Sequence, residues 1–73
     1  MSIKHEERYK NIGIKVAKYR KERNMTQEDL ANAVGVSYGY ITQIEAPNVV
    51  KKMSLEVLYD IADVLNIDIK DLL

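Results

Sequence analysis

The chain has 73 residues, no cysteine, one histidine and a formal net charge of zero. This length predicts one small domain with a modest core. The lack of cysteine excludes a disulfide framework and a thiolate metal site, and the lone His5 argues against a zinc site. No apolar run approaches the roughly 18 residues of a transmembrane helix, and the N-terminus lacks the apolar core of a signal peptide, so we expect a cytoplasmic protein.

The zero net charge hides an uneven distribution along the chain. Residues 1–24 have a net charge of +5, residues 25–50 have −3 with no Lys or Arg, and residues 51–73 have −2. A neutral total argues against nucleic-acid binding, whereas a basic first third is compatible with it. Charge by itself therefore leaves both a nucleic-acid-binding protein and a protein-interaction module open.

The N-terminal part predicts an arm followed by a helix. Residues 1–8 are polar and are expected to form a flexible arm. Over residues 9–23, Ile12, Val16 and Tyr19 recur at the spacing of one helix face. We therefore expect the first helix to pack this face against the rest of the domain.

Residues that begin and end helices divide the rest of the chain. Thr26, Ser37, Ser54 and Asp68 each suit an N-cap position, and Gly35 lies where glycine commonly ends a helix. No strand pattern is found, so the predicted fold class is all-α with five short helices. The four helices after the first are expected at about residues 27–34, 38–45, 55–65 and 69–73.

The stretch "TQEDLANAVGVSYGYITQIE" resembles the helix-turn-helix of the lambda-repressor-like, or Cro/C1/Xre, family of DNA-binding proteins. Gln27 opens the first motif helix, Ala31 is the small residue where the two helices cross, Gly35 occupies the turn and Glu45 closes the second helix. The resemblance covers roughly residues 11–73, so it is more than a single motif. It implies a DNA-binding domain in which helices 2 and 3 form the helix-turn-helix.

The loop after the motif departs from the family pattern. Family members usually have a short loop with Gly and then Pro-Ser-Leu, whereas this chain has "EAPNVVKKMSL". Proline comes early, glycine is absent and the loop is longer by about two residues. In the family this loop borders the DNA backbone, so the departure lies in a segment expected to contact phosphates.

The second motif helix is expected to read bases although it carries no positive charge. A step of 100° per residue turns Ile41 and Ile44 inward and leaves a polar face outside. Glutamine can pair with an adenine edge, and a threonine methyl group can meet a thymine methyl group. The predicted base contacts are Gln43, Thr42, Tyr38 and Gly39.

Elements that flank this helix are expected to bind phosphates, which supply most of the affinity of such proteins. The N-terminus of the helix before it offers backbone amides and the positive end of a helix dipole. Few cations are available, so a modest affinity and a small salt dependence are expected. The predicted phosphate contacts are Gln27, Ser37, Tyr40, Lys51, Lys52 and Lys18.

Simpler interpretations remain open for several of these residues. Tyr38 and Tyr40 can instead cover the edge of a small core, and Lys51 and Lys52 can serve only to keep a loop soluble. Gly39 costs about 1 kcal/mol of helix stability relative to alanine. It either allows close approach to DNA or is merely tolerated.

The resemblance also implies an internal ion pair between Arg20 and Glu45. Arg20 interrupts the apolar side of the first helix, and Glu45 lies on the inner edge of the third. Family members carry an arginine and a glutamate that pair at the matching positions. We interpret the pair as structural, and removal of one partner is expected to be costly if the site is buried.

The C-terminal segment "NIDIKDLL" has more apolar side chains than one short helix is expected to hide. Exposed apolar surface of this kind usually marks an interface. Related proteins of this size also commonly dimerise through this element. The predicted homodimer interface is Ile67, Ile69, Leu72 and Leu73.

These patterns favour a sequence-specific DNA-binding transcriptional regulator, a repressor or controller that binds a pseudo-palindromic operator as a homodimer. The alternative is a protein-interaction module of the same fold that does not bind DNA, which the zero net charge and the acidic C-terminal half support. An enzyme is disfavoured, because the chain has no cysteine and no glycine-rich phosphate loop. Double-stranded DNA and a second copy are the expected partners, on the nucleoid, with no cofactor, metal, membrane or small-molecule ligand.

Overall fold

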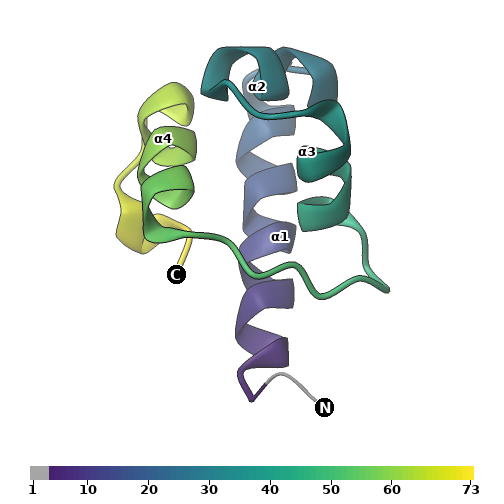
Figure 1. Ribbon diagram of the computed structural model, residues 1–73. Coiled ribbons are helices and arrows are strands. Elements are labelled where there is room, and N and C mark those ends of the chain that lie inside the picture. The colour runs from purple at the N-terminus through teal and green to yellow at the C-terminus, as the bar shows by residue number, and fades with distance from the viewer. Residues whose placement is uncertain (1–3) are drawn as a thin grey trace.

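The computed structural model describes residues 4–73, and these fold into four α-helices and a short 3-10 turn (Figure 1). Helix α1 stands at the centre, with α3 on one side and α4 on the other, and α2 lies across one end. No strand and no helix suited to cross a membrane occur within residues 4–73. The elements are α1 (Glu6–Glu22), α2 (Gln27–Val34), α3 (Tyr38–Glu45), α4 (Leu55–Leu65) and η1 (Ile69–Asp71).

Local capping explains the bounds of the three shorter helices. The hydroxyl groups of Thr26, Ser37 and Ser54 each accept a hydrogen bond from a backbone N–H in the first turn of α2, α3 and α4. Gly35 ends α2 with φ of 88°, a left-handed conformation that glycine adopts without steric cost. These helices therefore begin and end at the residues that the sequence signals indicate.

Helix α1 begins earlier than the sequence pattern indicates. Residues 6–8, expected in the arm, are helical, and the carbonyl oxygen of His5 accepts hydrogen bonds from the backbone N–H groups of Arg8 and Tyr9. Glu6 pairs with Lys10 at 3.1 Å, one turn further along, and its charge suits the positive end of the helix dipole. The remainder of the predicted arm includes residues 1–3, which lie outside the described residues.

The prediction of a fifth helix at about residues 69–73 needs correction. The chain forms only a 3-10 turn at Ile69–Asp71. Asp68 and Asp71 close this turn with a capping box, in which each side chain accepts a hydrogen bond from the backbone of the other end. Leu72 follows the turn directly and is fully buried. Its entry into the core ends the element before a longer helix can form.

The core joins all four helices around α1. Its fully buried side chains come from every helix, so no helix can be removed without exposing apolar surface. Helices α1 and α3 approach so closely that a Cβ atom at Gly13 would overlap the backbone carbonyl oxygen of Ile44. The largest fully buried side chains are Val16, Leu30, Ile41, Ile61, Leu65 and Leu72.

Candidate nucleic-acid interface

Helix α3 has one buried side and one exposed side. Ile41 and Ile44, at 0% and 3% exposure, hold the helix on the domain. On the opposite side Tyr38, Gly39 and Gln43 are exposed. The structure thus presents three of the four residues predicted to contact bases on one accessible surface.

Hydrogen bonding distinguishes the polar side chains on this surface. The hydroxyl group of Thr42, which is half-buried, donates to the carbonyl oxygen of Gly39 at 2.9 Å, so its proton is already used within the helix. Its methyl group remains for apolar contact. The exposed Gln43 side chain forms no hydrogen bond to any residue within 4–73, so its amide is available to an external partner. Gln43 therefore offers both a donor and an acceptor on the exposed side of α3.

The two tyrosines of α3 occupy different environments. Tyr38 is 55% exposed, whereas Tyr40 is partly buried and packs against the core. The Nζ atom of Lys51 lies 4.6 Å from the centroid of the Tyr40 ring, within the range of a cation–π contact. Tyr40 therefore covers the edge of the core and also anchors the loop that follows α3.

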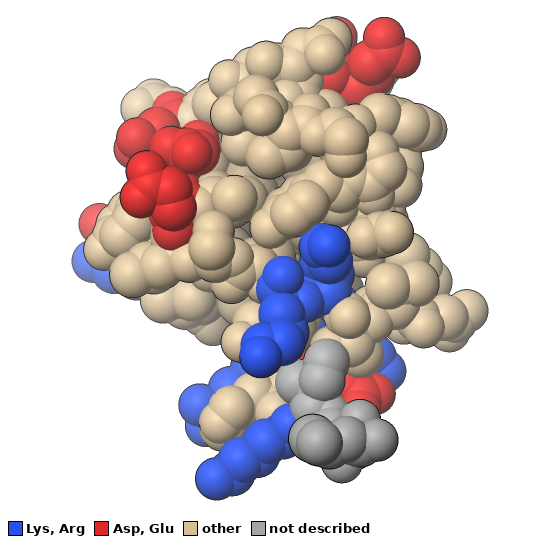
Figure 2. Space-filling view, viewed as in Figure 1, with Lys and Arg blue, Asp and Glu red and all other residues tan. Residues whose placement is uncertain are grey.

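The loop between α3 and α4 supplies the positive charge that lies nearest along the chain to the exposed side of α3. In Figure 2 a group of basic side chains lies in the middle of the view, where this loop crosses the molecule. Lys51 is half-buried against Tyr40, and Lys52 is exposed. The two lysines therefore differ, because one holds the loop and the other extends freely into solvent.

The N-terminus of α2 is less suited to a phosphate than the sequence indicates. The side-chain nitrogen of Gln27 donates to Glu45 at 3.1 Å, so one of its donors already serves an internal contact. Glu28 and Asp29 place two carboxylates in the first turn. Hydrogen bonds from the backbone and hydroxyl of Thr26 lower the pKa of Asp29, so that it stays charged and opposes a second anion.

Two other predicted phosphate contacts are placed differently. Ser37 is exposed, but its hydroxyl oxygen accepts from the Tyr40 backbone N–H as the α3 cap, which leaves its proton to donate. Lys18 lies five residues after Gly13, about 140° around α1 from the side that contacts α3. Its ammonium group instead lies 5.1 Å from the Tyr19 ring. The fold therefore does not bring Lys18 to the α3 surface.

A buried ion pair ties α3 to α1. The guanidinium group of Arg20 donates twice to Glu45, from Nε at 2.8 Å and from Nη2 at 2.9 Å, and once to the carbonyl oxygen of Met25 at 2.7 Å. The two side chains are 10% and 5% exposed. The hydrogen bonds to Glu45 raise the pKa of Arg20 above its ordinary value. This pair, together with Gln27, holds the last turn of α3 by side-chain contacts from α1 and α2.

Gly13 is a positioning residue that the sequence patterns did not reveal. It lies in the middle of α1, faces the backbone of Ile44 and is buried. Only a residue without a side chain allows this separation of α1 and α3. The available signal was a glycine inside an otherwise helical pattern, which costs about 1 kcal/mol and so indicates a packing reason.

The C-terminal residues predicted to form a dimer interface do not share one surface. Leu72 is 0% exposed and belongs to the monomer core, because it packs under α4 after the 3-10 turn. Its assignment to an interface is therefore wrong. Ile67 and Ile69 are half-buried against the same core, and Leu73 is 62% exposed. Among these four residues only Leu73 offers a large apolar side chain to a partner.

Comparison with known proteins agrees with this geometry. Residues 16–72 match the family model described as "Helix-turn-helix". An uncharacterized HTH-type transcriptional regulator from Bacillus subtilis (strain 168), YazB, is 37% identical over 60 residues, which span 82% of this chain and 84% of that protein.

Solved structures show the same fold. SinR, the master regulator for biofilm formation, solved in complex with DNA, is 31% identical with a TM-score of 0.77 over 84% of this chain and 95% of that chain. The restriction-modification controller protein C.AhdI from Aeromonas hydrophila is 23% identical with a TM-score of 0.81 over 89% of this chain and 96% of that chain. These likenesses confirm the predicted all-α, lambda-repressor-like fold.

Proposed function

Because the chain belongs to the Cro/C1-type helix-turn-helix family, we propose that it is a sequence-specific, DNA-binding transcriptional regulator that acts on the nucleoid as a homodimer. Its operator is pseudo-palindromic, since a two-fold protein reads two half-sites in opposite orientations. The two copies of α3 then lie about 34 Å apart, one duplex turn, and enter successive major grooves. The relatives named above are regulators, and SinR is solved with DNA.

The free polar face of α3 is the observation that carries this proposal. Gln43 is exposed with an unused amide, Tyr38 is exposed beside it, and Gly39 leaves room for close approach. The last turn of α3 is held by the ion pair of Arg20 with Glu45, so contacts within the domain position this face before DNA binds. Such pre-organisation lowers the entropy cost of binding.

Phosphate binding is assigned to the edge of this face. Lys51 and Lys52 in the loop after α3 and the Ser37 hydroxyl at the start of α3 supply these contacts, whereas the N-terminus of α2, with its two carboxylates and the engaged Gln27 side chain, contributes less. Phosphate contacts position the protein but carry little sequence information. With so few free cations, the salt dependence of binding is expected to be shallow.

Selection of bound sequences from a random DNA pool, followed by footprinting, tests the proposal. A symmetric site protected on one face of the duplex is the expected result. If no sequence is enriched even at low salt, the chain is instead a protein-interaction module of this fold, and the proposal is wrong.

The Gln43→Ala variant tests the base-reading role within the selected site. We expect a loss of about 1–3 kcal/mol of operator affinity and a relaxed preference at one base pair per half-site, because a side chain that pairs with a base edge is lost. Asn32→Ala, which removes an exposed amide from α2, is the matched control and should bind normally. Equal weakening of Gln43→Ala toward operator and random DNA would contradict the base contact.

A further inference from the structure

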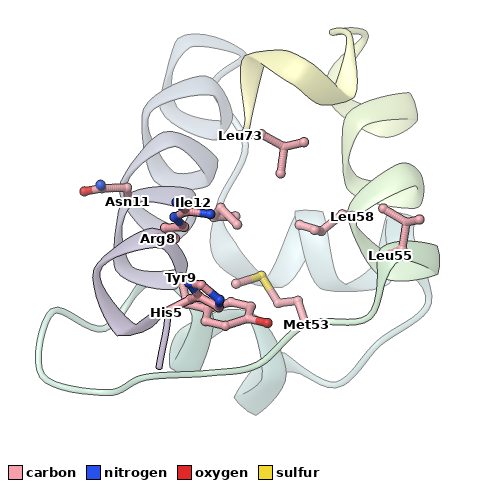
Figure 3. A pocket seen from close by; sticks show the side chains of 9 residues that line it. All are labelled: His5, Arg8, Tyr9, Asn11, Ile12, Met53, Leu55, Leu58 and Leu73. Carbon is pink, nitrogen blue, oxygen red and sulfur yellow. The ribbon is translucent and has the colours of Figure 1, made fainter. Parts of the chain in front are cut away.

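A groove of about 550 Å³ lies on the side of the domain where α1 and α4 meet (Figure 3). Its floor is apolar and buried, formed by Ile12 of α1, Met53 of the loop and Leu58 of α4. Figure 3 shows Leu73 and Leu55 at its edge, from the C-terminal segment and the start of α4. The volume lies within the roughly 300–1,000 Å³ of sites that hold small organic molecules.

The α1 wall of this groove carries a cation and no side-chain carboxylate. Arg8 lines the groove one turn before Ile12, on the same side of the helix, because residues four apart on a helix are neighbours. Arg8 takes part in none of the ion pairs that form within residues 4–73. Among the residues of this range that line the groove, none is Asp or Glu. An anion at Arg8 therefore meets a cation without another partner in this range, and no opposing side chain.

Two hydrogen-bond donors accompany Arg8 on the same wall. The ring of Tyr9 is half-buried against the core, and Figure 3 shows its hydroxyl oxygen directed toward Met53, across the groove. The imidazole group of His5 lines the groove at the start of α1. A phenol and an imidazole can each donate one hydrogen bond to a carboxylate oxygen. The groove thus combines an apolar floor with a wall suited to an anion.

We propose that this groove binds a small amphipathic carboxylate, a molecule with one carboxylate group and an unbranched hydrocarbon chain, as in a fatty acid. The carboxylate accepts charge-assisted hydrogen bonds from Arg8. The chain lies on the floor, where its contact with Ile12, Met53 and Leu58 removes apolar surface of both molecules from water. Each part of the ligand therefore meets a surface of matching chemistry.

The site is distinct from the proposed DNA interface. Helices α3 and α4 lie on opposite sides of α1 (Figure 1), and none of the groove-lining residues is among the proposed DNA contacts. Arg8, Tyr9 and Ile12 also precede residue 16, where the match to the helix-turn-helix family model begins. The wall that recognises the carboxylate thus comes from a segment before the matched part. The inference goes beyond the proposed function and adds a ligand that the sequence patterns did not predict.

Isothermal titration with octanoate and decanoate, below the concentrations at which they form micelles, tests the apolar part of the site. Burial of each methylene group tightens binding about fourfold, so decanoate should bind about fifteenfold more tightly than octanoate. Decylamine, which is positively charged at neutral pH, should bind at least about tenfold more weakly than decanoate. Absence of decanoate binding, or equal binding of decanoate and decylamine, would overturn the proposal.

The Arg8→Gln variant tests recognition of the carboxylate. It should bind decanoate about fivefold more weakly, the size expected for an exposed charge pair, and should bind decanol as the wild type does. Lys21→Gln is the matched control, because Lys21 is an exposed cation of the same helix that does not line the groove. Circular dichroism checks that both variants are folded. Equal weakening in the two variants would assign the effect to overall charge and overturn the role of Arg8.

A second copy of the chain is the competing occupant of this groove. Decanoate affinity measured at two protein concentrations about tenfold apart should be unchanged, whereas a fall at the higher concentration would show that a copy covers the groove and would overturn the proposal. Failure of this inference is distinguishable from failure of the proposed function. A protein that selects a specific DNA sequence but binds no decanoate refutes the ligand site alone.

Discussion

Substitution of Gly13 by alanine tests how α3, the helix proposed to read bases, is positioned. The added Cβ atom would overlap the backbone carbonyl oxygen of Ile44 and lie 3.1 Å from its carbonyl carbon. Neither atom belongs to a flexible side chain, and the next residue, Glu45, is held by Arg20. The clash can therefore be relieved only if α1 and α3 move apart, by roughly 1 Å.

The expected effect on stability follows from two opposing contributions. Overpacking of this kind costs about 1–3 kcal/mol, and a contact with backbone belongs at the upper end. Alanine in place of glycine inside a helix stabilises the folded state by about 1 kcal/mol. The net expectation is a destabilisation of about 2 kcal/mol, or a fall in Tm of roughly 8–16 °C for a domain of this size.

Urea unfolding followed by circular dichroism measures this change, and Gly39→Ala is the matched control. Gly39 is also in a helix, but the nearest atom to an added Cβ is the Ser37 hydroxyl oxygen at 4.0 Å. Gly39→Ala should therefore stabilise the protein by about 0.5–1 kcal/mol. If this stabilised variant binds the operator more weakly, Gly39 allows close approach to DNA, and unchanged binding means that the glycine is merely tolerated.

Two results would refute the reasoning about Gly13. A Gly13→Ala variant as stable as Gly39→Ala would show that α1 and α3 do not constrain each other at this crossing. A destabilised variant with unchanged operator affinity, measured where it is fully folded, would show that the crossing does not set the position of the reading helix.

Three further changes follow from the contacts. Glu45→Ala leaves Arg20 buried without its partner, so we expect a loss of about 3–5 kcal/mol in urea unfolding, and a loss below 1 kcal/mol would contradict a buried pair. The pKa of Asp29 is lower in the folded protein than in the unfolded chain, so its stabilising effect is present above the unfolded value and is lost as the pH falls through the folded value. The difference in Tm between the wild type and Asp29→Asn should accordingly shrink below about pH 4 in thermal scans, whereas a constant difference would exclude the titration. Lys52→Ala should lower the slope of log K against log salt by about one, while an unchanged slope would remove this lysine from the DNA backbone.

Much of the local structure could be read from single residues. The caps Thr26, Ser37 and Ser54 act on backbone groups within three residues, and the left-handed Gly35 acts on its own helix end. Such contacts depend little on the rest of the fold, so they mark helix ends in the sequence itself. The inward direction of Ile41 follows in the same way from the geometry of one helix.

The ion pair of Arg20 with Glu45 could be predicted only in part from the sequence. The two residues are 25 positions apart, and no local pattern joins them. They were paired through the family resemblance, and the structure adds what that resemblance does not contain. It shows the third hydrogen bond of Arg20 to Met25 and the donation from Gln27, which reduces the capacity of Gln27 to bind phosphate.

The sequence by itself determined where α2, α3 and α4 begin and end and which face of α3 is apolar, because caps and periodicity act over a few residues. Only the tertiary structure decided how those helices meet. Gly13 matters because α3 crosses it, Leu72 is buried because the chain folds back on α4, and Leu55 at the start of α4 stays exposed. Each of these depends on residues distant in sequence, and burial is a property of the assembled core rather than of the side chain that enters it.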